Sequence, residues 1–226
     1  MLLTVIIPVY NEESTIEQVV RAVHAVDLDL EIVAVDDASS DNTVTILERL
    51  QEEGLVRLFR QPANQGKGAA VRRGIGEARG EICVIQDADL EYQPSDFPAL
   101  IRPITELGAD AVYGSRFLGP HRVFLYWHYT ANRMLTWLTN VLYDTMLTDM
   151  ETGYKAVRTE ILRGMGLRSN TFDIEPEITA KLFKRSYKVF EVPITYNGRT
   201  YAEGKKIGPL DALRALRALF RFRFVD

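Results

Sequence analysis

The sequence predicts one α/β domain built on a mostly parallel β-sheet, and two observations support this prediction. Short apolar runs suited to buried strands alternate with segments in which apolar residues recur at helical spacing. Strands that alternate with helices normally pair in parallel through right-handed crossovers. The chain has 226 residues, of which 46% are hydrophobic and 26% charged, and this composition suits one large core. We therefore treat residues 1–226 as a single domain.

The expected elements follow from this alternation. Ser14 to Glu17 has the form of a capping box, and Asp41 is a second helix-start signal. Strands are expected at about 3–9, 31–35, 56–59, 82–86, 111–114 and 187–194. Helices are expected at about 16–26, 41–50, 67–78, 96–107, 125–147, 175–185 and 209–221. The alternation is regular in residues 1–118 and loosens in residues 119–226, which we expect to extend the same domain as its second half.

Composition restricts the cellular setting that we expect. The lone Cys83 sits in an apolar run, so no disulfide can form within the chain, which fits a reducing cytoplasm. We expect no signal peptide, because the apolar residues 2–9 lack a basic leader and stop at Pro8. We also expect no membrane-spanning helix, because no apolar run reaches about 18–20 residues. The net charge is −4. An acidic body with a short basic tail argues against nucleic acid as the main partner.

Acidic residues follow three of the expected strands at the point where each strand ends. Glu12 follows the first, Asp37 the second, and Asp87 and Asp89 the fourth. Ligands of parallel sheets bind beyond the carboxyl ends of the strands, so these clusters share one edge. Mg²⁺ takes one or two protein carboxylates together with phosphate oxygens, which suits the Asp87-Ala88-Asp89 turn. The sequence therefore predicts a site for a nucleotide and a divalent metal, Mg²⁺ or Mn²⁺.

Eight short motifs occur in a fixed order along nearly the whole chain. The first five are Pro8-Val9-Tyr10-Asn11-Glu12, Val35-Asp36-Asp37, Asn64-Gln65-Gly66-Lys67-Gly68, Gln86-Asp87-Ala88-Asp89-Leu90-Glu91 and Gly114-Ser115-Arg116. The chain resembles the family 2 glycosyltransferases of GT-A fold in these motifs. The later three are Thr148-Asp149-Met150-Glu151-Thr152-Gly153-Tyr154-Lys155, Phe172-Asp173-Ile174-Glu175-Pro176-Glu177 and Val192-Pro193-Ile194-Thr195-Tyr196-Asn197-Gly198-Arg199-Thr200. In these it is similar to the branch of dolichyl-phosphate mannose synthases, although many relatives carry C-terminal transmembrane helices.

The resemblance implies roles for individual residues. Those expected at the nucleotide are Pro8, Tyr10, Glu12, Asp37, Lys67, Gly68, Asp87 and Ala88. Asp87 and Asp89 would hold the metal and the diphosphate. Residues expected to bind acceptor or phosphate groups are Arg116, Arg133, Arg199 and Lys205. Arginine binds phosphate through paired, charge-assisted hydrogen bonds, which agrees with this assignment.

Asp149 is a candidate catalytic residue together with Asp89 and Arg199. A carboxylate normally deprotonates a hydroxyl acceptor, whereas a phosphate acceptor is already ionised near neutral pH. Asp149 therefore fits either a base or a residue that orients the acceptor or an arginine. Glu151 and Glu175 each fit a structural role as well as a functional one.

The segment at about 209–221 predicts a basic amphipathic helix. Arg214, Arg217 and Arg221 share one stripe, while Leu213, Leu216, Leu219 and Phe220 lie on a neighbouring face. Such a helix suits either the surface of an anionic membrane or ordinary packing with solvated arginines. A lipid-linked acceptor would favour the first, as a peripheral protein on the cytoplasmic face.

The leading hypothesis is an inverting transfer of one hexose from a nucleotide diphosphate sugar to a polyprenyl or dolichyl phosphate. GDP-mannose is the first choice of donor and UDP-glucose the second. One alternative is a soluble, metal-dependent transferase that acts on a hydroxyl acceptor. A sugar-phosphate nucleotidyltransferase and a non-catalytic adaptor at the membrane are further alternatives. The former usually has a Gly-rich loop where Asn11-Glu12-Glu13 stands here.

Overall fold

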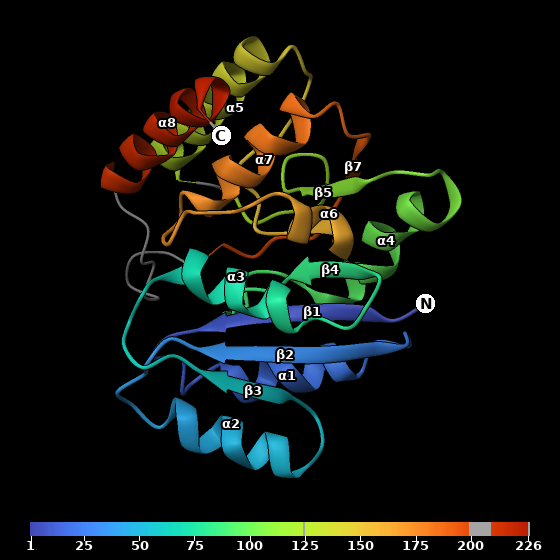
Figure 1. Cartoon of the computed structure of the whole chain (residues 1–226), viewed down its shortest axis with the longest axis vertical. Coiled ribbons are helices and arrows are strands. Elements are labelled where there is room, and N and C mark those ends of the chain that lie inside the picture. Colours follow the sequence, from blue (N-terminus) through green and yellow to red (C-terminus); the bar gives the residue numbers. More distant parts are fainter. Residues whose placement is uncertain (124, 199–208, 226) are drawn as a thin grey trace.

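The central feature of the protein is one seven-stranded sheet, seen in a computed structural model that describes residues 1–123, 125–198 and 209–225. The strand order is β3-β2-β1-β4-β6-β5-β7. The strands are β1 (Leu3–Val9), β2 (Leu30–Asp36), β3 (Arg57–Arg60), β4 (Ile82–Ile85), β5 (Ala111–Ser115), β6 (Lys155–Arg158) and β7 (Val189–Pro193). All neighbouring pairs are parallel except those of β6 with β4 and β5. The predicted α/β class with a mostly parallel sheet is confirmed (Figure 1).

Helices cover both faces of this sheet. They are α1 (Ile16–His24), α2 (Thr43–Glu52), α3 (Lys67–Glu77), α4 (Phe97–Glu106), α5 (Tyr126–Tyr143), α6 (Thr159–Gly164), α7 (Ile174–Lys184) and α8 (Pro209–Phe224). A short 3-10 helix, η1 (Pro94–Asp96), leads into α4. Helices α1, α2 and α4 pack on one face, and α3 with α5 to α8 on the other. In Figure 1 helices α5 and α8 lie at the opposite end of the molecule from α2.

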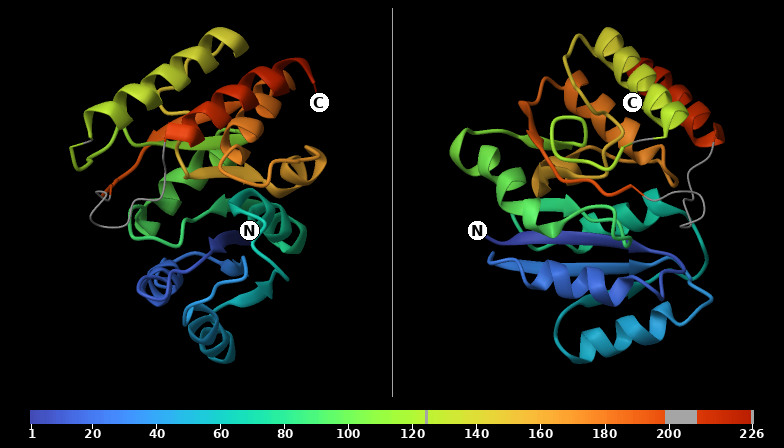
Figure 2. Two further views of the ribbon diagram at one scale, coloured as in Figure 1. Left: turned by 90° about the vertical axis from the view of Figure 1, so that its left-hand side faces the viewer. Right: turned by 180° about the vertical axis from the view of Figure 1, so that it is seen from behind.

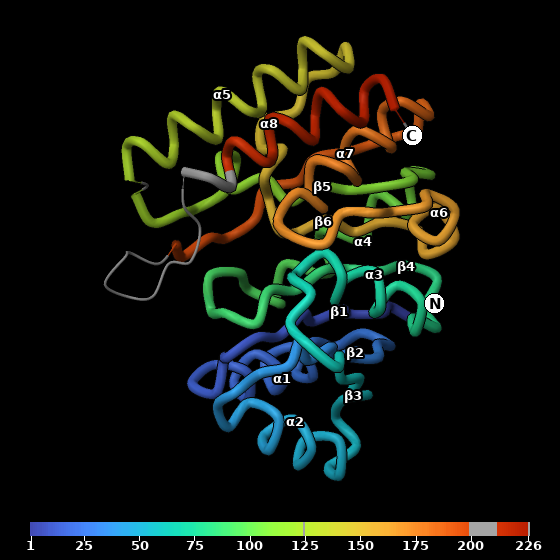
Figure 3. Tube along the Cα trace, turned by 60° about the vertical axis from the view of Figure 1, so that its left-hand side comes forward, coloured from blue at the N-terminus to red at the C-terminus, as the bar shows by residue number. Residues whose placement is uncertain are grey.

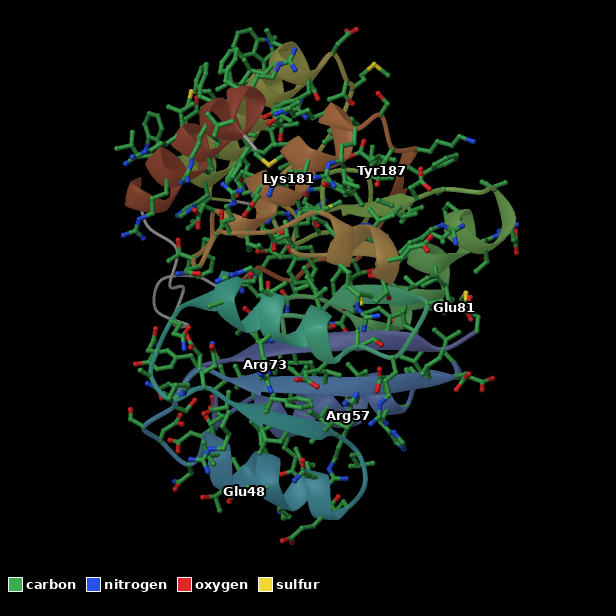
Figure 4. All side chains as sticks on the ribbon, in the orientation of Figure 1. Glu48, Arg57, Arg73, Glu81, Lys181 and Tyr187 are labelled. Carbon is green, nitrogen blue, oxygen red and sulfur yellow. The ribbon has the colours of Figure 1, made fainter. Side chains whose placement is uncertain are left out.

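The core has two layers because successive strand residues point to opposite faces. In β1, Leu3, Val5 and Ile7 contribute to the layer beneath α1 and α4, while Ile6 contributes to the layer beneath α3. Side chains fill the space between the sheet and its helices (Figure 4). Lys181 of α7 lies against α8, with its ammonium 5.3 Å from the ring centre of Phe222.

Three sequence expectations need correction. Helix α1 begins at Ile16, and its N-cap residue, Thr15, makes no side-chain capping bond, so Ser14 forms no capping box. The Thr15 hydroxyl instead donates to the backbone oxygen of Ala88, at 2.9 Å. Helix α5 ends at Tyr143 rather than near 147, because Asp144 adopts a left-handed conformation with φ of 51°.

The third correction concerns the segment that follows Gly153, where no strand was expected. Strand β6 is only four residues long and has a charged residue at each end, Lys155 and Arg158. Such a segment gives no apolar run to recognise. The strand nevertheless pairs with β4 on one side and with β5 on the other, so it is a central strand. Residues 148–155 lead into this strand and therefore lie near the middle of the sheet.

Candidate active site

A cavity of about 600 Å³ opens at the edge where β1, β2 and β4 end. Further parts of its wall come from the start of α3, from α5 and from α7. This is the edge at which open α/β sheets bind their ligands. Residues expected at the nucleotide, the metal or a phosphate group that line the cavity are Pro8, Tyr10, Glu12, Asp37, Lys67, Asp87, Ala88, Asp89 and Arg116.

Two further candidates, Gly68 and Arg133, lie in the described part of the chain but do not line the cavity. Gly68 is buried beside the cavity, where an added Cβ would come within 2.6 Å of the backbone oxygen of Ser169. Arg133 is exposed and donates to the backbone oxygen of Thr148 at 3.4 Å, away from the cavity wall. Arg199 and Lys205 fall outside the described residues.

Asp37 organises the loop that leads into α3. Its carboxylate accepts hydrogen bonds from the Gln61 side chain at 2.8 Å and from the backbone N–H groups of Gln65 at 2.8 Å and Gly66 at 2.7 Å. Gly66 has a φ of 98°, a backbone conformation that favours glycine. Three protein donors therefore hold this carboxylate at the cavity wall, and through it they fix the position of Lys67.

The carboxylates of Asp87 and Asp89 follow the buried strand β4 and line the cavity. One oxygen of Asp87 lies 2.6 Å from the Lys67 ammonium. One oxygen of Asp89 accepts the backbone N–H of Glu91 at 3.1 Å. Gly153 packs so tightly against this turn that an added Cβ would lie 2.8 Å from the other Asp87 oxygen. The turn is therefore held in place from two sides.

These two aspartates fit a divalent metal that is shared with a nucleotide. Among the described residues, no group of three or more His, Cys, Asp or Glu side chains is arranged to hold a metal ion. A fully protein-bound ion is therefore not supported there, but Mg²⁺ needs only one or two carboxylates when phosphate oxygens complete its shell. The Lys67 ammonium beside Asp87 shows that a cation is stabilised at this oxygen. Its neighbours Asp87 and Glu175 raise the pKa of Lys67, against the opposing effect of burial.

Arg116 and Asp149 form a buried ion pair at the end of β5. The guanidinium Nε and Nη2 atoms each donate to a different Asp149 oxygen, both at 2.7 Å. The backbone N–H of Arg116 adds a third bond at 3.0 Å. Asp149 is fully buried and does not line the cavity, whereas Arg116 does. Asp149 strongly raises the pKa of Arg116, although burial opposes that effect.

The segment that carries Asp149 is fixed by Glu191 of β7. The Glu191 carboxylate accepts the backbone N–H of Thr148 at 2.9 Å and that of Asp149 at 3.2 Å. Burial raises the pKa of Glu191. Glu191 thus holds the backbone of Asp149, while both oxygens of the Asp149 carboxylate accept hydrogen bonds from Arg116.

Three further charged residues belong to this site, and two of them, Glu151 and Glu175, line the cavity. Lys155 is fully buried and donates to Glu175 of α7 at 2.7 Å. The Lys67 ammonium lies 3.5 Å from the other Glu175 oxygen. Glu151 also lines the cavity, and burial raises its pKa to about 7. The sequence analysis assigned no role to Lys155, because nothing local indicates that its ammonium is buried beside Glu175.

Two tyrosines, Tyr92 and Tyr196, line a further part of the cavity wall. Tyr92 stacks on Tyr154 with ring centres 4.6 Å apart, and its hydroxyl accepts the backbone N–H of Gly153 at 2.8 Å. Tyr196 donates to the Glu91 carboxylate at 2.5 Å, and the Arg116 guanidinium lies 5.3 Å from its ring centre. These rings keep the walls around Asp87 and Arg116 in fixed positions.

Residues 4–166 match the model of glycosyl transferase family 2, and the chain belongs to this family. The sheet order and the carboxylate-lined cavity agree with a glycosyltransferase of GT-A fold. The chain is 33% identical over 215 residues to a dolichol-phosphate mannosyltransferase of Pyrococcus furiosus, covering 92% of this chain and 60% of that protein. It is 29% identical over 214 residues to an undecaprenyl-phosphate mannosyltransferase of Micrococcus luteus, covering 90% of this chain and 86% of that protein. The chain thus spans less than two thirds of the Pyrococcus relative.

Solved structures confirm the fold. Glucosyl-3-phosphoglycerate synthase from Mycobacterium tuberculosis superposes with a TM-score of 0.76 at 21% identity, over 99% of this chain and 80% of that one. That enzyme has been crystallised with Mn²⁺, UDP and glucosyl-3-phosphoglycerate, and also with Mg²⁺ and UDP.

Proposed function

We propose that this glycosyltransferase moves one hexose from a nucleotide diphosphate sugar to a polyprenyl phosphate, with inversion at the anomeric carbon. Its relatives named as mannosyltransferases of dolichol phosphate and undecaprenyl phosphate support this acceptor. They also support mannose as the transferred sugar, with GDP-mannose as the first donor to test. UDP-glucose is the second, because the structurally similar synthase binds UDP.

The observation that carries the proposal is that one cavity joins two chemically different regions. Asp87, Asp89 and Lys67 line one part, and Trp127 and His128 of α5 line another. Trp127 is 78% exposed, so the cavity reaches the exposed aromatic surface of α5. A donor diphosphate suits the first region, and a phosphate carried on a lipid chain suits the second.

At the diphosphate, the side chains would balance the charge that develops when the sugar leaves. Asp87 and Asp89 would hold a divalent cation, which would supply Lewis-acid stabilisation of the departing diphosphate. Lys67 lies 2.6 Å from Asp87, so its ammonium is available to the same phosphate groups. During transfer the bond between the anomeric carbon and the phosphate oxygen breaks. Both effects would stabilise the negative charge that this oxygen gains.

At the acceptor, Arg116 would orient the attacking phosphate. An oxygen of that phosphate forms the new bond to the anomeric carbon from the face opposite the departing diphosphate. A phosphate monoester is ionised near neutral pH, since its second pKa is about 6, so no base is needed. The position of Asp149 agrees with this scheme, because it holds the Arg116 guanidinium at 2.7 Å and does not line the cavity.

Transfer of labelled sugar tests the proposal. The protein is incubated with radiolabelled GDP-mannose or UDP-glucose, Mn²⁺ or Mg²⁺, and polyprenyl phosphate in detergent. We expect a labelled lipid with one of the two donors and none when the metal is chelated. If neither donor gives labelled lipid, the proposed acceptor is wrong.

We also propose that helices α5 and α8 rest on a membrane surface at the cytoplasmic face. No helix in the described ranges is both long and apolar enough to cross a bilayer. Helices α5 and α8 lie side by side in two views and in the tube trace (Figures 2 and 3). On α5, Met134, Trp137 and Val141 are 55%, 63% and 61% exposed at helical spacing. Exposed aromatic and apolar side chains of this kind insert at the headgroup boundary.

Helix α8 has features that suit each of the two roles left open by the sequence. Its face formed by Ala215, Ala218, Leu219 and Phe222 is buried, so the helix packs on the protein. The basic stripe remains at the surface, where it suits anionic lipid headgroups; its exposed members are Arg214, Arg217 and Arg221. Leu213 and Phe220, on the neighbouring face, are 64% and 43% exposed.

Flotation on liposomes tests this surface. The double variant Trp137→Ser, Val141→Ser removes apolar area that lies outside the cavity wall. We expect it to float less than the wild type with liposomes that contain anionic lipid. The control is Leu107→Ser, which removes a side chain of equal exposure, 61%, at the end of α4. Equal flotation of the wild type and both variants would contradict the proposed surface.

A hydroxyl acceptor is the second candidate, and one observation favours it. Burial raises the pKa of Glu151 to about 7, which is suitable for a general base. A base of this kind would be required for a hydroxyl acceptor and not for a phosphate acceptor. Two results together would support this candidate. Labelled sugar would be transferred to a soluble alcohol, and Glu151→Gln would lose this transfer both below and above pH 7.

A further inference from the structure

Two glutamates in the cavity wall each keep one hidden oxygen without a hydrogen-bond partner. Within the described ranges, only four buried side-chain polar atoms lack such a partner, and two of these are Glu151 Oε1 and Glu175 Oε1. Both residues line the cavity. Glu175 is only 4% exposed, and its other oxygen already accepts a hydrogen bond from Lys155. Glu175 Oε1 lies 3.5 Å from the Lys67 ammonium, an ion-pair distance without a hydrogen bond. Because buried acceptors without hydrogen bonds are costly and rare, these two oxygens indicate a ligand that supplies donors.

The two glutamates lie next to the expected position of the diphosphate. The Lys67 ammonium is 2.6 Å from Asp87 and 3.5 Å from Glu175 Oε1, so a single ammonium separates the two carboxylates. Glu151 lies two residues before Gly153, the backbone of which packs against Asp87. In a nucleotide sugar the hexose is bonded directly to the terminal phosphate. A donor with its diphosphate at Asp87 therefore brings its hexose to these glutamates.

Charge excludes the other substrate groups from this position. Carboxylates repel both the diphosphate and an acceptor phosphate, each of which suits Lys67 or Arg116 instead. A second metal ion is disfavoured at Glu175, because the ammonium groups of Lys67 and Lys155 already lie 3.5 and 2.7 Å from its oxygens. Sugar hydroxyls are uncharged donors, and hydrogen bonds from them to a carboxylate are stronger than those between neutral groups.

We propose that Glu151 and Glu175 bind hydroxyl groups of the hexose and so select the sugar of the donor. The identity of the donor rests on the function proposed above. Mannose and glucose differ only in the orientation of one ring hydroxyl. A site built to accept a hydrogen bond from a hydroxyl discriminates strongly against a ligand that leaves its buried acceptor without a partner.

Binding of the donor with and without its sugar tests this inference. Calorimetry with Mn²⁺ and no acceptor compares GDP-mannose with GDP, and UDP-glucose with UDP, for the wild type and for Glu151→Gln. We expect the variant to bind the preferred nucleotide sugar about tenfold more weakly or worse, while its affinity for the nucleoside diphosphate changes less than about twofold. Glu175→Gln should give the same selective loss.

Glu177→Gln is the matched control on the same helix. Glu177 is fully buried, pairs with Lys181 at 2.7 Å and accepts the backbone N–H of Ser169 at 2.7 Å, but it does not line the cavity. This variant should lose affinity for the nucleotide sugar and for the nucleoside diphosphate to the same extent, or lose affinity for neither. If Glu175→Gln does not fold, Glu151→Gln still tests the inference. Its substitution breaks no hydrogen bond at Oε1, because this buried oxygen has no hydrogen-bond partner within the described residues.

Three results would overturn the inference. If Glu151→Gln lost equal affinity for the nucleotide sugar and the nucleoside diphosphate, Glu151 would not recognise the sugar selectively. Unchanged binding of both would show that Glu151 acts elsewhere, for example as a base. Weaker binding of Mn²⁺ alone would make it a metal ligand. If the wild type binds neither donor, the proposed function falls and the inference with it, whereas intact donor binding without transfer to polyprenyl phosphate contradicts only the proposed acceptor.

Discussion

Replacement of Asp149 by Asn separates the two roles that a carboxylate at this position can have. In the structure both oxygens of Asp149 accept hydrogen bonds from Arg116 at 2.7 Å, and the residue is fully buried. Asparagine has nearly the same shape but no charge, and its NH₂ group would face a guanidinium N–H. The variant therefore loses the ion pair and one of the two guanidinium bonds, and it leaves the Arg116 charge buried.

The expected cost follows from this geometry. Removal of one partner from a buried ion pair costs about 3–5 kcal/mol, and asparagine, which keeps one acceptor, should fall near 3 kcal/mol. For a chain of this size each kcal/mol lowers Tm by about 2–4 °C, so we expect a loss of about 6–12 °C. Transfer should also slow greatly, because Arg116 loses its fixed orientation at the cavity wall.

The assay combines thermal denaturation with transfer kinetics in a double-mutant cycle. The variants are Asp149→Asn, Arg116→Gln and the double substitution. If Asp149 acts through Arg116, the double variant should be about as slow as the slower single variant, since residues in contact are not additive. The pH dependence of the residual kcat should keep the shape of the wild type. Asp149 would instead be the base if three results were found together. Asp149→Asn would have a normal Tm, its pH profile would lack the acidic limb, and the rate losses would be additive in the double variant.

Three further predictions concern the neighbouring charges. Without nucleotide, Lys67→Met should bind Mn²⁺ more tightly than the wild type, because the ammonium 2.6 Å from Asp87 is removed. The same variant should bind nucleoside diphosphate more weakly, and calorimetry measures both affinities. Gly153→Ala should weaken Mn²⁺ binding to the nucleotide complex, because its Cβ would lie 2.8 Å from an Asp87 oxygen; unchanged binding would contradict the tight packing. Burial raises the pKa of Glu151 from 4.5 to about 7, so the stability that its neutral form contributes is complete below pH 4.5 and is lost as pH rises through 7. Glu151→Gln stays neutral, so its Tm should rise relative to the wild type between pH 5 and pH 8.

Much of the fold could be predicted because its signals are local. Apolar runs such as 3–9 and helical spacing in α1 follow from burial on one face, and parallel order follows from their alternation. Asp87 and Glu12 could be assigned to one edge for the same reason, since both follow strands that end there. Strand β6 could not be predicted, because its position depends on pairing with two distant strands.

The charge network could not be read from the sequence for a related reason. Arg116 and Asp149 are 33 positions apart, and Lys155 and Glu175 are 20 apart. Nothing in either neighbourhood indicates which opposite charge lies within 3 Å after folding. The sequence therefore left Asp149 between two roles, and it gave no signal that separates Glu151 and Glu175 from structural glutamates.

The choice of acceptor is the most direct test of the central claim. The protein is incubated with labelled GDP-mannose or UDP-glucose, metal ion and equal amounts of polyprenyl phosphate and polyprenol, and the anomeric configuration of the product is determined by NMR. We expect label only in the phosphate-linked lipid, with the configuration opposite to that of the donor. Label in polyprenol, or a product with the donor's configuration, would contradict the account.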